Sequence, residues 1–202
     1  MDIDTIVKNL SKERFMFYSE ADFKFSLAWQ IKEYYSNTEI RLERRFNDKY
    51  IDVVILLNER TYGIELKYKT RQLNDLEEQY NLITQGAQNL GKYDFIKDVM
   101  RLETLLNDNN IDEGYAIWLT NDHLYWSEPS KDSVGYFEFS VHQNATKKGE
   151  LNWKQNINRV RLGKRKKKII LDGIYPINWE VYSNIEQVNN GLFKYSINRI
   201  SH

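Results

Sequence analysis

The sequence predicts an α/β fold in which a central mixed β-sheet is flanked by helices on both faces and extended by a mainly β C-terminal elaboration. Three observations predict this class: strand-like runs between residues 39 and 69, helical patterns before and after them, and a further apolar run at 113–122. The 202 residues are enough to bury a core and few enough for one domain. Within it we expect a core over 15–125 and a β-rich extension over 126–202.

The first predicted helix covers residues 19–35, SEADFKFSLAWQIKEYY. Ser19 and Asp22 stand in capping-box positions, and apolar residues follow at helical spacing. The segment EIRLERRF (39–46) alternates apolar and charged residues, which is typical of a half-exposed strand. Residues 50–70, YIDVVILLNERTYGIELKYKT, contain two hydrophobic runs either side of a polar break. They predict a β-hairpin, so three consecutive strands follow the helix.

A second helical pattern runs from Leu76 to about Leu106, where Gly91 indicates a break or kink. The segment EGYAIWLTND (113–122) is then a short apolar run of strand type. Further strands are expected in the extension at residues 136–141, 167–171 and 177–183.

The composition argues against several classes of protein. The chain has no cysteine, which excludes disulfides and thiolate metal sites. Lys plus Arg equals Asp plus Glu at 29 each, so the net charge gives no sign of a polyanionic partner. The longest apolar run, Val53 to Leu57, is too short to span a bilayer, and the N-terminal segment lacks the pattern of a signal peptide. No glycine-rich phosphate loop is present, which argues against ATP and dinucleotide cofactors. We therefore expect a cytoplasmic protein without a membrane partner.

Three ionisable residues interrupt the hydrophobic hairpin, namely Asp52, Glu65 and Lys67. A turn around Glu59 and Arg60 would place Asp52 opposite Lys67 and diagonal to Glu65, with Glu65 and Lys67 on one face. Two neighbouring carboxylates repel each other as anions unless a divalent cation lies between them. Oxygen ligands without Cys or a nearby His favour Mg²⁺ or Mn²⁺ over Zn²⁺. A lysine beside such a site would orient or deprotonate a water, or neutralise charge on a phosphate.

This arrangement resembles a known motif. Asp52, followed by Glu65 and Lys67 on the next strand and framed by helices, is similar to the D…(D/E)-x-K core of the PD-(D/E)XK nuclease superfamily, and in particular to its small uncharacterised bacterial members. The resemblance covers roughly residues 15–122 and implies a restriction-endonuclease-like core. It also implies an Mg²⁺-dependent (or Mn²⁺-dependent) deoxyribonuclease in which Asp52 and Glu65 bind the metal and Lys67 serves the attacking water.

Other positions match the superfamily less uniformly. Many members place a glutamate on the first helix near the metal; Glu20 matches it and lies on the helix face that must be buried. Ile51 stands where the motif has its proline. Gln85 or Gln88 would be an auxiliary residue, although the spacing to Tyr93 departs from the Q-x-x-x-Y pattern of one branch.

Two groups of basic residues are candidates for nucleic-acid contacts. The run RVRLGKRKKK (159–168) carries seven Lys or Arg in ten residues, and a smaller cationic trail leads out of the predicted site. The residues expected to contact phosphates are Lys69, Arg71, Lys164, Arg165, Lys166, Lys167 and Lys168. Alternatively, the run is a solvated hairpin tip whose charge prevents aggregation. The expected partner is DNA, with RNA as an alternative, and a homodimer would supply the two active sites needed to cut a duplex.

Two less specific interpretations of the acidic residues remain open. Asp52 could end a turn while Glu65 and Lys67 form a cross-strand or solvent-facing pair. The chain could also be a catalytically inactive nucleic-acid- or protein-binding module on a nuclease-like fold. Apolar residues on both faces of the hairpin argue against the first, because they indicate a strand covered on both sides. Clustered buried acids argue against the second, because a binding module does not need them.

Overall fold

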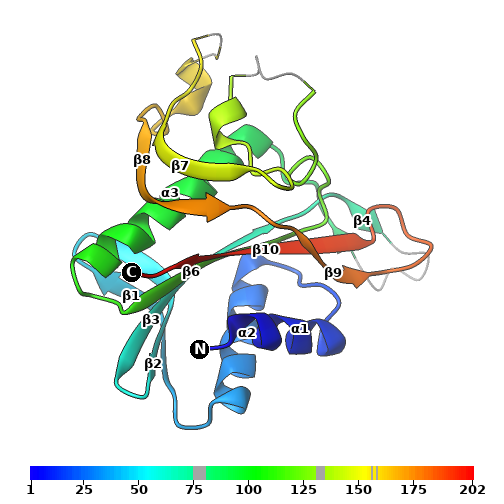
Figure 1. Ribbon diagram of the computed structural model, residues 1–202. Coiled ribbons are helices and arrows are strands. Elements are labelled where there is room, and N and C mark those ends of the chain that lie inside the picture. The colour runs from blue at the N-terminus through cyan, green and yellow to red at the C-terminus, as the bar shows by residue number, and fades with distance from the viewer. Residues whose placement is uncertain (75–80, 131–134, 156, 158) are drawn as a thin grey trace.

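The computed structural model describes residues 1–74, 81–130, 135–155, 157 and 159–202. In these ranges six strands form one mixed sheet in the order β1–β2–β3–β6–β10–β9 (Figure 1). The strands are β1 (Glu39–Phe46), β2 (Lys49–Leu57), β3 (Arg60–Lys69), β6 (Glu113–Thr120), β9 (Glu180–Asn184) and β10 (Leu192–Ile200). Among these neighbours β3 and β6 are parallel and the other pairs are antiparallel. The predicted α/β class with a central mixed sheet is confirmed.

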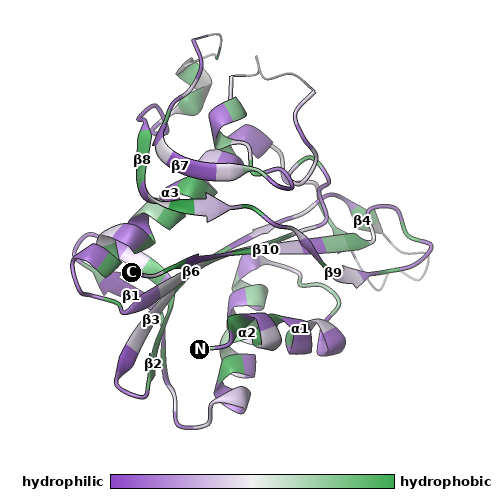
Figure 2. Cartoon of the chain, viewed as in Figure 1, coloured by the Kyte–Doolittle hydropathy of each residue, from purple (hydrophilic) through white to green (hydrophobic). Residues whose placement is uncertain are grey.

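Helices cover both faces of this sheet. The helices α1 (Ile3–Glu13) and α2 (Glu20–Tyr34) pack on one face, while α3 (Gln88–Asn107) packs on the other with the hairpin of β7 (Thr146–Leu151) and β8 (Ile169–Pro176) (Figure 1). All three helices carry both hydrophobic and hydrophilic residues (Figure 2), as expected when one side of a helix faces a core and the other faces solvent. Of the helices that the structure describes, none has both the length and the hydropathy of a membrane-crossing segment.

The start of α2 and both ends of β1 agree with the sequence pattern. Ser19 is the N-cap of α2, and its hydroxyl accepts a hydrogen bond from the Asp22 N–H at 3.0 Å.

α1 is not among the predicted elements, although Asp2 caps it and Ile3 and Ile6 begin a buried stripe at helical spacing. This helix closes the core on its side of the sheet.

The long helix predicted from residue 76 to residue 106 is shorter in the structure. Residues 75–80 lie outside the described ranges, Asn81–Leu82 form the short strand β5, which pairs with β4 (Leu73–Asn74), and α3 begins only at Gln88. The predicted break at Gly91 is wrong, because α3 continues through it. A Cβ atom at this position would lie 3.0 Å from the Tyr125 hydroxyl oxygen, so the glycine permits close packing.

The C-terminal part is mainly β: β7 and β8 form a separate two-stranded sheet, and β9 and β10 join the central sheet. The strand predicted at 136–141 is absent; a 3-10 helix, η1 (Phe137–Phe139), occupies that place, and a second one, η2 (Arg159–Leu162), precedes β8. β8 and β9 overlap the strands predicted at 167–171 and 177–183. β10 pairs with β6, and β9 pairs with β10, so this part of the chain completes the central sheet.

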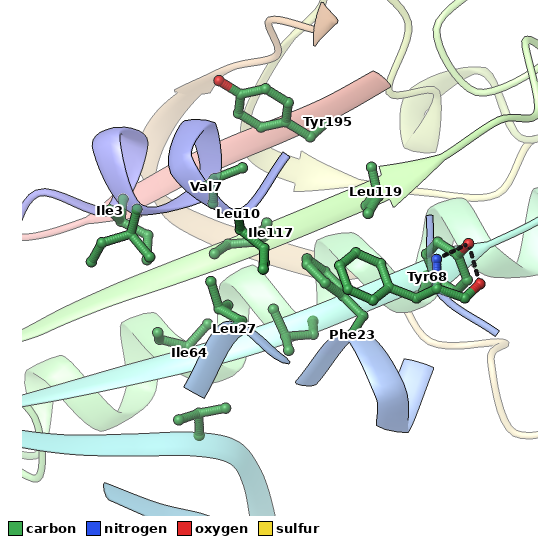
Figure 3. Packing of buried hydrophobic residues seen from close by; sticks show 14 of the residues in the cluster. Ile3, Val7, Leu10, Phe23, Leu27, Ile64, Tyr68, Ile117, Leu119 and Tyr195 are labelled. Atoms are coloured by element: carbon green, nitrogen blue, oxygen red, sulfur yellow. Dashed lines mark hydrogen bonds between the residues drawn. The ribbon is translucent and has the colours of Figure 1, made fainter. Parts of the chain in front are cut away.

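A buried tyrosine connects β3 to the loop before α2 (Figure 3). The Tyr68 hydroxyl donates a hydrogen bond to the Phe17 carbonyl oxygen at 2.6 Å and accepts one from the Phe17 N–H at 3.1 Å. Phe17 is itself fully buried, so its backbone groups need protein partners. Because Phe17 lies two residues before Ser19, these hydrogen bonds hold the start of α2 against β3.

We expect Tyr68→Phe to lower the free energy of unfolding by about 1–3 kcal/mol, because both backbone groups of Phe17 lose a buried partner. Urea unfolding followed by circular dichroism measures the change. Tyr182→Phe is the matched control: its hydroxyl is buried in the same core and has no hydrogen-bond partner among the described residues. Its removal should cost less than about 0.5 kcal/mol. Equal losses in the two variants would contradict the prediction.

Candidate active site

The turn of the β2–β3 hairpin sets the register of the acidic residues. Asn58 and Glu59 both have positive φ angles, 50° and 62°, as a two-residue type I′ turn requires. Val53 consequently pairs with Ile64. The predicted turn around Glu59 and Arg60 is wrong by one residue, because asparagine at position 58 adopts the left-handed conformation readily.

Asp52 lies just beyond the paired part of β2 and β3. Continuing the register would put it opposite Glu65, so the predicted position opposite Lys67 is wrong. Its Oδ2 atom accepts a hydrogen bond from the Leu66 N–H at 2.9 Å, where a ladder bond between the strands would otherwise form. The Asp52 side chain therefore replaces a missing backbone partner of β3.

Glu20, the first residue of α2, serves the same edge of β3 further along. Its Oε2 atom accepts a hydrogen bond from the Tyr68 N–H at 3.0 Å. N–H groups two residues apart on a strand point to the same side and lie about 7 Å from each other. The carboxylates of Asp52 and Glu20 thus bind adjacent positions on this edge, while β6 pairs with the opposite edge.

Lys24, one turn along α2 from Glu20, neutralises Asp52. Its Nζ atom lies 2.9 Å from Asp52 Oδ1 and also contacts the Glu43 carboxylate of β1. Burial by itself would raise the pKa of Asp52, but the hydrogen bonds from Lys24 and from the Leu66 N–H outweigh it and lower the pKa. Burial likewise disfavours charge on Lys24, yet its hydrogen bonds to Asp52 and Glu43 raise the pKa of the amine. Asp52 is therefore a carboxylate, and Lys24 an ammonium, at neutral pH.

Glu65 and Lys67 point to the other face of the sheet, toward α3. Arg101 forms an ion pair with Glu65, and its Nη2 atom lies 3.1 Å from Asp98 Oδ1. The Nζ atom of Lys67 lies 2.5 Å from Asp98 Oδ2. Acidic and basic side chains therefore alternate in one largely buried row of contacts, in the order Glu65, Arg101, Asp98 and Lys67.

Burial and neighbouring charges shift the pKa values of these four side chains. Burial, reinforced by the Asp98 carboxylate, raises the pKa of Glu65 to about 9 against the opposing charge of Arg101. Burial also raises the pKa of Asp98. For Lys67, burial favours the neutral amine, but the Asp98 and Glu20 carboxylates outweigh it and raise the pKa. At neutral pH Glu65 thus retains a proton, and Lys67 is an ammonium.

The contacts of these acids differ from those of a metal site. Within the described ranges, no three His, Asp or Glu side chains are placed to hold one ion. Carboxylate oxygens are the donors that Mg²⁺ and Mn²⁺ prefer, so the chemistry of Glu20, Asp52 and Glu65 fits a hard cation. In this structure Lys24 engages Asp52, and Arg101 engages Glu65, in place of such a cation.

The predicted auxiliary glutamines lie elsewhere. The Nε2 atom of Gln88 donates a hydrogen bond to Asp122 Oδ2 at 3.0 Å, and Arg71 Nε lies 3.2 Å from Asp122 Oδ1. The backbone N–H of Gln85 donates to the Thr70 carbonyl oxygen at 2.8 Å. In the described part of the chain neither glutamine is hydrogen-bonded to Glu20, Asp52 or Glu65.

Three residues of the site were missed from the sequence: Lys24, Asp98 and Arg101. Asp98 carried a readable signal, since it lies at helical spacing with the buried residues Phe95 and Leu102. The same argument singled out Glu20 on the first helix. Lys24 and Arg101 carried none, because a long cationic side chain on a helix is usually solvated.

The predicted basic run approaches the site along α3. Arg165 forms a two-point ion pair with Asp94, with Nε–Oδ1 and Nη2–Oδ2 distances of 2.6 and 2.7 Å. Asp94 precedes Asp98 by four residues, so it lies on the same helix face about 6 Å away along the axis. Lys168 pairs with Glu150. The remaining lysines of the run, Lys164, Lys166 and Lys167, are exposed.

Of the two basic residues that follow the motif on β3, Arg71 is held by Asp122, as described above. Lys69 is partly exposed at the last position of β3. Lys69 therefore lies on the strand that carries Glu65 and Lys67, with its side chain accessible to a ligand.

Comparisons with protein-family models, with curated protein sequences and with solved structures gave no match to this chain.

We expect Glu65→Gln to stabilise the metal-free protein increasingly as the pH rises. The folded state raises the pKa of Glu65 from 4.5 to about 9, so it favours the protonated side chain. The stability that this preference provides is complete below pH 4.5 and is lost as the pH rises toward 9. Glutamine does not titrate and keeps a neutral group beside Arg101. The difference in unfolding free energy between variant and wild type should grow by about 1–4 kcal/mol between pH 5 and pH 8.

Urea unfolding at several pH values in the presence of EDTA measures this difference. Glu59→Gln, at the exposed turn of the same hairpin, controls for the general loss of a negative charge. A difference for Glu65→Gln that stays constant across the pH range would contradict the assignment of Glu65 as a protonated buried acid.

Proposed function

We propose that the chain is a metal-dependent nuclease that hydrolyses phosphodiester bonds of DNA by a PD-(D/E)XK mechanism. The observation that carries the proposal is the placement of Glu20, Asp52, Glu65 and Lys67 around one stretch of β3. There β2 no longer pairs with β3, and side chains from α2 and α3 reach the strand from opposite faces. Four ionisable groups on one short stretch are costly to bury, which favours a chemical role over a structural one.

The order of the elements supports the same proposal. α2, the antiparallel strands β1, β2 and β3, then α3 and the parallel strand β6 follow one another as in the restriction-endonuclease-like core that the motif implies. We include that core in the proposal, with α1 and the strands after β6 as additions to it.

In the proposed reaction a water oxygen attacks phosphorus and loses its proton to solvent, while the P–O bond to the leaving oxygen breaks and that oxygen takes up a proton from solvent. Negative charge builds up on the phosphoryl oxygens during this step. Lys67 is suited to stabilise this charge, because its raised pKa keeps it an ammonium and unable to accept a proton from the water. Asp98 holds that ammonium in position at 2.5 Å. Glu20, Asp52 and Glu65 would hold Mg²⁺ or Mn²⁺, which supplies Lewis acidity and lowers the pKa of a bound water.

Purified protein with Mg²⁺ or Mn²⁺ should cleave plasmid, linear or single-stranded DNA. We expect Lys67→Met to reduce turnover by at least about 10²-fold while metal affinity stays nearly unchanged, because an electrostatic group is lost and no ligand is. Asp52→Asn should instead weaken metal binding by at least about tenfold, while its amide oxygen still accepts the Leu66 N–H. Lys12→Met, on the exposed side of α1, is the control for a lost lysine.

Cleavage is followed on gels, and metal binding by calorimetry. The proposal fails if the folded wild type binds Mg²⁺ or Mn²⁺ but leaves DNA and RNA of every tested form intact. It also fails if Lys67→Met cleaves as fast as Lys12→Met.

The basic run offers a test of substrate binding that does not depend on turnover. We expect Lys166→Ala/Lys167→Ala to weaken binding of a duplex oligonucleotide and to reduce the slope of log affinity against log salt by up to about 1.8, or about 0.9 per lost phosphate contact. Lys8→Ala/Lys12→Ala removes the same charge from α1, on the other side of the sheet, and should leave the slope unchanged. Fluorescence anisotropy in EDTA measures both. Equal slopes for the two double variants would exclude the run from the DNA interface.

The second candidate is a nucleic-acid- or protein-binding module without turnover. The observation that favours it is that Asp52 and Glu65 are already in contact with Lys24 and Arg101. A nucleic-acid-binding module would bind the oligonucleotide with wild-type affinity in Asp52→Asn, and a module of either kind would show no melting shift with Mg²⁺ or Mn²⁺. A metal-dependent melting shift that disappears in Asp52→Asn would rule it out.

A further inference from the structure

Lys24 is shared by two carboxylates on neighbouring strands. Its Nζ atom lies 2.9 Å from Asp52 Oδ1 on β2 and contacts the Glu43 carboxylate on β1. The pairing of β1 with β2 brings Glu43 and Asp52 to the same level of the ladder. The ammonium can therefore stay paired with either carboxylate after the other is lost.

The two carboxylates differ in their surroundings. The Asp52 side chain is 16% exposed and the Glu43 side chain 56% exposed. Asp52 uses its Oδ2 atom for the Leu66 N–H, so only Oδ1 is occupied by Lys24. Exchanging the partner of Oδ1 would leave the hydrogen bond to β3 in place.

Glu43 also has unusual backbone geometry. Its φ angle is 50°, in the left-handed region, although it lies inside β1 and is not a glycine. Such a conformation is strained for a residue with a side chain and persists only where the surrounding structure imposes it. The strained residue is the one that holds Lys24 from the exposed side.

We propose that Lys24 is an internal counter-cation, which occupies Asp52 when no divalent metal is bound and is transferred to Glu43 when metal binds. The inference rests on the proposed function, because it takes Asp52 as a metal ligand. A counter-cation role for Lys24 explains why an acid whose oxygen atoms suit Mg²⁺ is in contact with a cation of the protein itself. Metal affinity is then set by two opposing residues: Lys24 competes for Asp52, and Glu43 draws Lys24 away from it.

The test is a double-mutant cycle on binding of Mn²⁺ alone, measured by calorimetry. Lys24→Met should raise Mn²⁺ affinity by at least tenfold, because Asp52 loses its competitor. Glu43→Gln should lower the affinity several-fold in the wild-type background, because Lys24 then has Asp52 as its remaining partner. In the Lys24→Met background Glu43→Gln should have no more effect than Glu39→Gln. Glu39 lies on the same strand in an exposed pair with Arg41, so it controls for the loss of a nearby charge.

Thermal melts confirm that each variant is folded. If wild type and Lys24→Met both fold and neither binds Mn²⁺, the proposed function and this inference are both wrong. If wild type binds Mn²⁺ and cleaves DNA while Lys24→Met binds no more tightly, the nuclease function stands and the counter-cation role is refuted. An effect of Glu43→Gln that is the same with and without Lys24 would also refute it, because Glu43 would then act only through its charge.

Discussion

The unpaired edge of β3 is the constraint on which the site depends. β3 is ten residues long, but within the described residues β2 pairs with it only as far as Ile64. The next N–H groups on that edge, those of Leu66 and Tyr68, need acceptors because they are shielded from water. Asp52 and Glu20 supply them. The folding of the sheet therefore fixes two carboxylates beside the part of β3 that carries the Glu65 and Lys67 side chains, before any ligand is present.

Carboxylates in this position require compensation by positive charge. On the α2 side Lys24 provides it for Asp52, and on the α3 side Arg101 and Lys67 provide it for Glu65 and Asp98. The two faces differ in one respect. Asp52 has a depressed pKa and is ionised, whereas burial raises the pKa of Glu65 to about 9 and keeps its side chain protonated at neutral pH. The acid on the α3 side is thus protonated at neutral pH, whereas the acid on the α2 side is ionised. A cation that bound Glu65 would therefore release a proton.

The sequence pattern predicted the elements whose signals are local. The capping residue Ser19 marked the start of α2, and alternating polarity marked β1. The predicted hairpin register is wrong by one residue because Asn58 takes the left-handed conformation in the turn, and one residue of error moves every cross-strand neighbour. Asp52 and Glu65 were identified because they interrupt the apolar runs of the predicted hairpin and match the D…(D/E)-x-K motif. Their partners Lys24 and Arg101 could not be, because long cationic side chains meet their acids only after α2 and α3 have packed on the sheet.

A structural role alone explains the acids poorly. The N–H groups of Leu66 and Tyr68 need only an acceptor, and a neutral Asn or Gln side chain supplies one at a lower desolvation cost than a carboxylate with its counter-ion. Replacing a buried ion pair by well-packed apolar residues of similar volume is often neutral or stabilising, so an ion pair at this edge adds little to stability. What the carboxylates of Glu20 and Asp52 add over amides is the capacity to bind a cation. Amides could make the same hydrogen bonds to the Leu66 and Tyr68 N–H groups, but they carry no negative charge. That charge is the feature of this site that favours a chemical role at β3 over a purely structural one.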